Sequence, residues 1–225
     1  TVDNVGGFGL CAGSPPTING SVITDSYPDL GITSAAVRAD MNAAFLSICA
    51  AGLPDAACSL GGATNLPAPT TLGAPAGNPY VLNDNYFLPG VYQGLTSILI
   101  TGDLTLDAQG DPNADFFFQS SSTIGMAAGA APPGVRSRIL LVNGAKASHV
   151  YWQATSDVTL GLYSEFQGNI LAAGDVTMNT GATSCGRLYA GAWSGGAGAF
   201  VFNSNAVSVP GRPFAPPATY STTCQ

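Results

Sequence analysis

The sequence contains very little charge, and the charged residues that it has are scattered. Only 8% of its 225 residues are Asp, Glu, Lys or Arg, against roughly 25% in an average soluble protein. It has one lysine, one glutamate and one histidine, and its net charge of −7 comes from aspartates that form no run. Nucleic-acid binding requires clustered Lys and Arg side chains that neutralise phosphates. The composition therefore excludes nucleic acid as a partner.

A long apolar run and a metal-binding pattern are also missing. The longest mostly apolar stretch, 43–53, is too short to span a bilayer. There is no CxxC spacing, and His149 is the single histidine, so the usual zinc ligand sets cannot be assembled. The segment Asp107–Asp111 is similar to a calcium loop, but too few oxygen ligands have the required spacing. We expect no membrane partner, no metal and no cofactor.

What the sequence does contain is an internal repeat. Residues 151–186 match themselves at an offset of 18, so that Asp157-Val-Thr-Leu160 returns as Asp175-Val-Thr-Met178. Further back, an offset of 34 places Phe118 on Trp152. Such a short period predicts a solenoid in which each repeat is one coil stacked on its neighbour. An 18-residue unit suits three short strands of about six residues each.

Apolar residues occupy one phase of the predicted strands throughout the stack. Because strand side chains alternate between two faces, this phase is predicted to point into the core. Its members are Phe118, Trp152, Ile170 and Leu188 on one strand, and Ile124, Val158, Val176 and Phe200 on the next. The outward ladder of that second strand is Gly125, Thr159, Thr177 and Val201.

One segment has a helical period instead. Residues 34–52 carry apolar side chains at i, i+3 and i+4 spacing, which predicts an amphipathic helix, and Gly52 and Pro54 predict its end. Nineteen residues span about 29 Å, close to the height of about six coils stacked 4.8 Å apart. The helix is therefore predicted to lie along one side of the solenoid and to leave two sides exposed.

The chain is predicted to form one domain, since a solenoid of this length need not divide. We expect a first coil at 5–30, the helix at 34–52, an irregular connection at 54–79, further coils at 80–209 and a tail at 210–225.

Five cysteines are present, at Cys11, Cys49, Cys58, Cys185 and Cys224. Cys49 and Cys58 close a short loop after the helix, so we expect a disulfide between them, with buried free thiols as the alternative. The odd number leaves at least one thiol unpaired or intermolecular. Since residue 1 is Thr, the chain is expected to be a mature or trimmed product.

Several ordered motifs make the chain similar to a known family. They are Leu88–Tyr92, Ile100–Pro112, Phe116–Gln119, Val142–Ala145, Val150–Gln153, Ile170–Ala172, Thr180–Thr183 and Gly186–Arg187. Through them the chain resembles the microbial ice-binding (antifreeze) proteins of the DUF3494 type. The resemblance implies a mainly β fold, a right-handed triangular β-solenoid of about six coils with one long α-helix packed alongside and the N-terminal coil beside the last one. It also implies adsorption to ice, thermal hysteresis and inhibition of ice recrystallisation, without catalysis or a cofactor.

A surface that binds ice should be flat, rigid and poor in charge, because ice presents only a lattice of water molecules. Threonine suits it, since its methyl is apolar, its hydroxyl binds one water and β-branching restricts χ1. We expect the ice-binding residues to be Thr159, Thr177, Thr180 and Thr183, with Thr101 and Thr105 as further candidates. The segment Leu162–Glu165, one repeat before Thr180–Thr183, interrupts this pattern with a ring and a carboxylate. Each threonine could equally be an ordinary exposed strand residue.

Two other function classes stay open at this point. Polysaccharide lyases and hydrolases with similar solenoids need paired carboxylates on one face, and Asp157 and Asp175 lie in adjacent repeats. A role in turns, accepting hydrogen bonds from loop amides, explains both equally well. His149 is interpreted as a surface or hydrogen-bonded histidine. The second alternative is an adhesive or structural module that lost ice affinity, which Leu162–Glu165 favours. Our hypothesis is a secreted monomer whose partner is ice.

Overall fold

The computed structural model describes residues 2–4, 22–24, 34–48, 62–192, 198–208 and 224. The chain divides into two compact units, Thr1–Ala44 and Phe45–Gln225, which are treated separately below. In the first unit, β1 (Val2–Asn4) pairs in parallel with β2 (Val22–Thr24). The helix α1 (Ser34–Ser47) crosses the boundary between the units. A single domain and a helix along the coils stay predictions.

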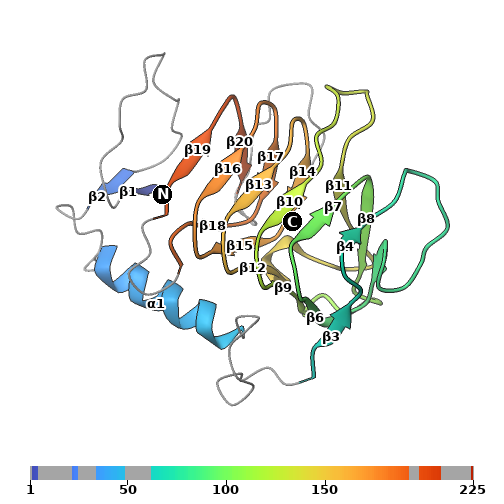
Figure 1. The fold of residues 1–225 in the computed structure, drawn as a ribbon, viewed down its shortest axis with the longest axis horizontal. Helices are drawn as coiled ribbons and strands as arrows, with labels where there is room; N and C mark the ends of the chain where they lie inside the picture. The colour runs from blue at the N-terminus through green and yellow to red at the C-terminus, as the bar shows by residue number, and fades with distance from the viewer. Residues whose placement is uncertain are drawn as a thin grey trace. The chain divides into compact units, whose positions relative to one another are not determined.

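The second unit is a β-solenoid of six coils, each built from three strands (Figure 1). Strands in the same position of successive coils pair in parallel, so the described residues of this unit form three sheets of six strands each. The first sheet contains β3 (Thr64–Leu66), β6 (Gly90–Gly94), β9 (Phe116–Ser120), β12 (Val150–Ala154), β15 (Asn169–Ala172) and β18 (Leu188–Tyr189). The second sheet contains β4 (Thr70–Leu72), β7 (Ile98–Ile100), β10 (Ile124–Met126), β13 (Val158–Leu160), β16 (Val176–Met178) and β19 (Phe200–Phe202). The third sheet contains β5 (Tyr86–Phe87), β8 (Asp103–Asp107), β11 (Arg138–Val142), β14 (Glu165–Gln167), β17 (Thr183–Cys185) and β20 (Ala206–Ser208).

The strand register confirms both repeat offsets found in the sequence. Val158 of β13 lies opposite Val176 of β16, and Phe118 of β9 lies opposite Trp152 of β12. The longer offset arises in the third coil, where residues 127–137 loop out between β10 and β11 and a short 3-10 helix, η2 (Ala147–His149), precedes β12. The predicted β-solenoid is thus confirmed.

The apolar phase of the repeats fills the core, as predicted. Phe118 and Trp152 are fully buried and stack with their ring centroids 4.1 Å apart, and Val158 and Val176 are fully buried as well. Phe200 is the exception, since the residue is 38% exposed, and Leu188 is only partly buried. Phe200 belongs to β19, the last strand of its sheet, so no further coil covers it within the described residues.

The segment 54–79, predicted to be irregular, contains two strands. β3 and β4 lie within it and, with β5, form the first coil. Each is three residues long, and Pro67 and Pro69 stand between them. Such short strands are defined by their pairing with β6 and β7. Three residues are too few to show an alternation of apolar and polar side chains, so the sequence did not indicate them.

Other predictions concern the ends of the chain. The helix begins at Ser34 as predicted, and its last helical residue is Ser47 rather than residue 52. The predicted first coil at 5–30 lies outside the described residues except for β2, and the expected disulfide between Cys49 and Cys58 lies outside them as well. No helix among the described residues is long and apolar enough to cross a membrane.

Candidate functional site

The outer face of the first sheet is covered in its middle coils. Gln153 and Gln119 point outward at equivalent positions of β12 and β9, yet both are almost fully buried. The Gln153 side-chain amide donates a hydrogen bond of 2.6 Å to the backbone carbonyl of Phe45, and Gln119 donates one to that of Ile48. This face is therefore occupied by the end of α1 and the residue that follows it.

The outer face of the third sheet carries paired charges. Arg138 binds Asp103 through two hydrogen bonds of 2.8 and 2.6 Å, and Arg136 binds Glu165 at 2.6 Å. The hydrogen bonds to Asp103 raise the pKa of Arg138 above its ordinary value. A disulfide also joins Cys185 of β17 to Cys224. Charged groups hold water strongly in their own geometry, so this face suits a regular water lattice poorly.

The outer face of the second sheet differs from both. Its central row takes one residue from each coil, in register, and none is charged. We call this row the second-sheet ladder, and its members are Thr71, Leu99, Gly125, Thr159, Thr177 and Val201. The part predicted from the sequence, Gly125 to Val201, is confirmed.

Two further rows flank the ladder, because residues two positions apart share a face of a strand. One row contains Ser97, Thr123, Asp157 and Asp175, and the other Thr101, Ala127, Gly161 and Asn179. The second of these rows continues the hydrogen bonding of the sheet. For example, the amide of Thr101 donates to the carbonyl of Leu72 at 2.8 Å, and that of Asn179 donates to Leu160 at 2.9 Å. Together the three rows are called the second-sheet surface.

The two aspartates of this surface are turn residues. Asp157 accepts a hydrogen bond of 2.8 Å from the backbone amide of Asp175, and Asp175 accepts one of 2.7 Å from the amide of Ala199. Each carboxylate thus ties its coil to the next one. This arrangement explains why the aspartate recurs in the repeat, and it agrees with a turn role rather than a catalytic pair.

The candidate threonines fall into different groups. Thr159 and Thr177 are opposite neighbours in the second-sheet ladder, and Thr101 lies on the same surface in a flanking row. Thr180 occupies the turn between β16 and β17. Thr183 belongs to β17 of the third sheet.

Thr105 is the one candidate that the structure removes from any exposed surface. It lies on β8 of the third sheet and is only 2% exposed. Thr101 and Thr105 belong to the same sequence motif, but the chain turns at Gly102 and passes from the second sheet to the third, so the two threonines lie on different sheets. Conversely, Thr71 belongs to the ladder and was missed, since β4 lies between prolines in a segment without visible alternation.

The segment Leu162–Glu165, which breaks the threonine pattern in the sequence, does not interrupt the second-sheet surface. The Tyr163 ring packs over Gly181 of the next coil so closely that a Cβ added there would lie 2.3 Å from the ring. Glu165 is on the third sheet and pairs with Arg136, which comes from the loop of the third coil. Tyr163 therefore packs in a turn and Glu165 is paired on the third sheet, so neither residue stands on the second-sheet surface.

His149 has a hydrogen-bonding partner, as interpreted from the sequence. Its Nδ1 lies 2.9 Å from a carboxylate oxygen of Asp115. Within the described ranges, no three His, Cys, Asp or Glu side chains come together as metal ligands.

Comparison with known proteins points to one family. A family model described as "Ice-binding-like" matches residues 2–194. The chain is 37% identical over 113 residues to "Ice-binding protein 1" of Shewanella frigidimarina, which covers 50% of this chain and 12% of that protein. It is 45% identical over 103 residues to an "Ice-binding protein" of Nostoc sp., covering 45% of this chain and 35% of the relative. The match thus spans about a third or less of each relative.

Solved structures of similar proteins have the same fold. The crystal structure of an ice-binding protein from the Antarctic ascomycete Antarctomyces psychrotrophicus is 29% identical with a TM-score of 0.64, over 86% of this chain and 77% of that one. The DUF3494 domain of Shewanella frigidimarina ice-binding protein 1 is 25% identical with a TM-score of 0.61, over 83% and 73%.

Proposed function

Because this chain belongs to the Ice-binding-like family, we propose that it adsorbs to ice through the second-sheet surface. The observation that carries the proposal is the second-sheet ladder, six uncharged residues presented in register by six stacked coils. The names of the similar proteins, which are ice-binding proteins, support ice as the partner.

The geometry of the ladder suits a lattice of water. Stacked strands repeat at about 4.8 Å, which is close to a repeat distance of ice. Buried residues on either side of every ladder position except Val201 fix the backbone. Thr159 and Thr177 offer a methyl and a hydroxyl with restricted χ1. The hydrogen bonds of Asp157 and Asp175 hold the edge of the surface in register.

The proposed activity is adsorption without catalysis or a cofactor. A protein bound across a growing ice face would restrict growth to the ice between adsorbed molecules, producing thermal hysteresis and inhibition of recrystallisation. This role fits a protein that works outside the cell as a monomer, since each solenoid carries a complete surface.

Substitution of Thr177 by Tyr tests the surface. A ring standing out from a flat row holds the ice lattice away from the neighbouring residues, so Thr177→Tyr is expected to abolish most of the thermal hysteresis. Thr183→Tyr is the matched control, because Thr183 is a half-buried strand residue of the same coil on the third sheet. The measurement is the gap between melting and growth of a single ice crystal in a nanolitre osmometer, with circular dichroism to check folding.

Either of two results overturns the proposal. Free growth of a smooth, round crystal in the unmodified protein rejects adsorption to ice altogether. Loss of hysteresis in Thr183→Tyr but not in Thr177→Tyr, with both variants folded, rejects the second-sheet surface and leaves adsorption through another face.

A further inference from the structure

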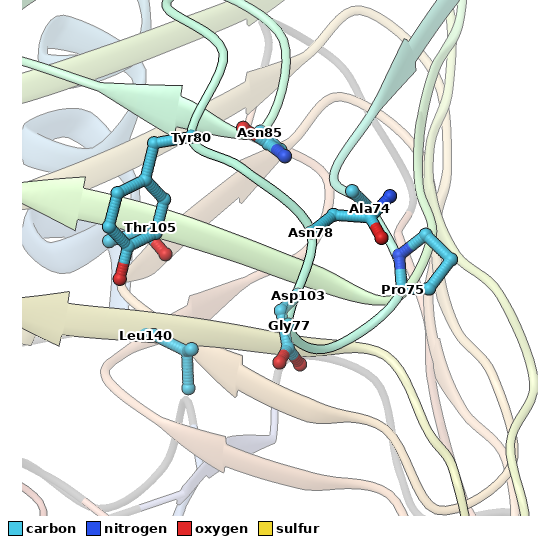
Figure 2. Close-up of a pocket in the computed structure, with 9 residues that line it drawn as sticks. All are labelled: Ala74, Pro75, Gly77, Asn78, Tyr80, Asn85, Asp103, Thr105 and Leu140. Carbon is cyan, nitrogen blue, oxygen red and sulfur yellow. The ribbon is translucent and has the colours of Figure 1, made fainter.

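A cavity lies on the outer side of the third sheet, away from the second-sheet ladder. Its volume is about 300 Å³. The loop between β4 and β5 forms one wall, and the strands β8 and β11 form the floor (Figure 2). The residues that line it and carry the argument are Asn78, Tyr80, Asp103, Thr105 and Leu140.

Thr105 is the first sign that the cavity accepts a ligand. The residue is 2% exposed and lines the cavity, and its backbone amide already donates to the carbonyl of Asn85 at 2.9 Å. Its side-chain hydroxyl has no hydrogen-bond partner within the described part of the chain. Among the described residues, the fully buried side-chain atoms without a partner belong to Asn42, Gln153 and Ser184. The Thr105 hydroxyl is therefore open to the cavity, where a ligand hydroxyl would replace water as its partner.

Asp103 and its partner Arg138 determine which ligand charge the cavity favours. Both of its oxygens accept hydrogen bonds from Arg138, at 2.8 and 2.6 Å, so the carboxylate is already neutralised. Each oxygen keeps a lone pair for a further donor. The ion pair has no net charge, so neither a cation nor an anion would gain a net attraction from it. The ligand is therefore neutral and carries hydroxyl or amide donors.

Tyr80 supplies an apolar platform at the opening. Its side chain is 69% exposed, and its ring packs against Tyr86 with the centroids 4.9 Å apart and the planes tilted by 33°. Figure 2 shows Tyr80, Thr105 and Leu140 in one group, with Asp103 and Asn78 on the side toward Ala74 and Pro75. An aromatic ring next to a few fixed polar groups is typical of a small-molecule site.

We propose that this cavity binds one ring of a neutral sugar, without catalysis. The apolar C–H face of a pyranose would lie against Tyr80 and Leu140, and its hydroxyls would bond Thr105, Asp103 and Asn78. A purely apolar ligand would leave the Thr105 hydroxyl unpaired, which disfavours it. Such a site would let the chain hold a glycan while the second-sheet surface stays free.

The test is saturation-transfer-difference NMR with the methyl glycosides of glucose, galactose, mannose and N-acetylglucosamine. At least one glycoside is expected to bind, with a dissociation constant of about 1 mM. Tyr80→Ala should weaken binding about tenfold by removing the ring contact. Thr105→Val should weaken it about three- to tenfold by removing one hydrogen bond.

Leu82→Ala is the matched control. Leu82 is an exposed apolar residue of the same loop, 56% exposed, and does not line the cavity, so its substitution should leave the affinity unchanged. Absence of saturation transfer from all four glycosides overturns the proposal, as does an affinity that falls equally in Leu82→Ala or stays constant in both test variants. Tyr80 lies outside the second-sheet surface, so the hysteresis of Tyr80→Ala should equal that of the unmodified protein whichever result is obtained.

Discussion

At the scale of single residues, Tyr86 and Asp107 are joined across neighbouring strands of the third sheet. The Tyr86 hydroxyl donates to a carboxylate oxygen of Asp107, which also accepts from the Asn143 amide at 2.8 Å and from the backbone amide of Gln109 at 2.7 Å. The hydrogen bond from Tyr86, with help from the other two donors, lowers the pKa of Asp107 below its ordinary 3.8. The same bond is the main cause that raises the pKa of Tyr86 above its ordinary 10.0.

These shifts predict how the stability contributed by the pair depends on pH. The lowered pKa of Asp107 gives stability that is present above about pH 4 and lost as the pH falls through the folded-state value. The raised pKa of Tyr86 gives stability that is present below about pH 10 and lost as the pH rises through the folded-state value. The difference in unfolding free energy between the unmodified protein and Tyr86→Phe should therefore be largest between these limits and shrink at both ends.

Urea unfolding at about pH 3, 7 and 11 measures this difference. Tyr163→Phe is a suitable control, since Tyr163 has no side-chain hydrogen bond within the described part of the chain. A difference that stays constant across all three conditions would contradict the assignment of the pair.

Residue-scale features differ in how far the sequence predicts them. The burial of Val158 and Val176 and the outward positions of Thr159 and Thr177 follow from alternation and the 18-residue repeat alone. The pair Arg136–Glu165 does not, because its partners lie in different coils and Arg136 comes from a loop whose length hides the register. The packing of Tyr163 over Gly181 could not be predicted either, because it depends on the conformation of a turn and not on strand alternation.

At the scale of elements, outward side chains of the first sheet bind the chain at the end of α1. Replacing Gln153 by Ala removes its hydrogen bond to the Phe45 carbonyl in a fully buried place. The expected loss is about 1–3 kcal/mol of unfolding free energy. Urea denaturation of the variant gives this value directly.

Gln93 provides the control for this prediction. It occupies the same outward row two coils earlier, where it is half-buried. Gln93→Ala should change the unfolding free energy by less than about 0.5 kcal/mol, as is usual for sites without buried partners. Equal losses in both variants would mean that the glutamine row stabilises the sheet itself and not the chain at the end of α1.

The elements that sequence reasoning missed are those without a local signal. β3 and β4 have three residues each, too few for alternation to be visible, and the prolines between them are typical of a loop. The helix was predicted correctly at its start but too long at its end, because apolar spacing continues beyond the last helical residue, Ser47. The strands β3 and β4 form because they pair with a neighbouring coil, and such long-range pairing is not visible in the local sequence.

At the scale of the whole solenoid, the three sheets have divided roles. The first sheet receives the end of α1, and the third holds the two Arg–carboxylate pairs, the disulfide and the cavity. The second sheet is left free of charge along its ladder. Self-similarity of the sequence made the stacking of coils predictable. The cysteine pairing was not, because five cysteines permit many connections and the bond joins a strand to the tail.

The disulfide between Cys185 and Cys224 gives the last prediction. It closes a separation of 39 residues, for which the chain-entropy relation gives about 4 kcal/mol. The double variant Cys185→Ala/Cys224→Ala should therefore lose about 2–4 kcal/mol of unfolding free energy, measured by urea denaturation without reductant. The single variant Cys224→Ala should lose nearly the same amount, since either change opens the bond.

Thermal hysteresis of the double variant shows whether the disulfide affects only the stability of the fold or also the surface that contacts ice. Cys185 lies on the third sheet, and the second-sheet ladder is held by its own strand pairs and by the hydrogen bonds of Asp157 and Asp175. While the variant stays folded near the freezing point, its hysteresis should match that of the unmodified protein. A folded variant that has lost hysteresis would show that the tail anchored at Cys224 contributes to the surface that contacts ice.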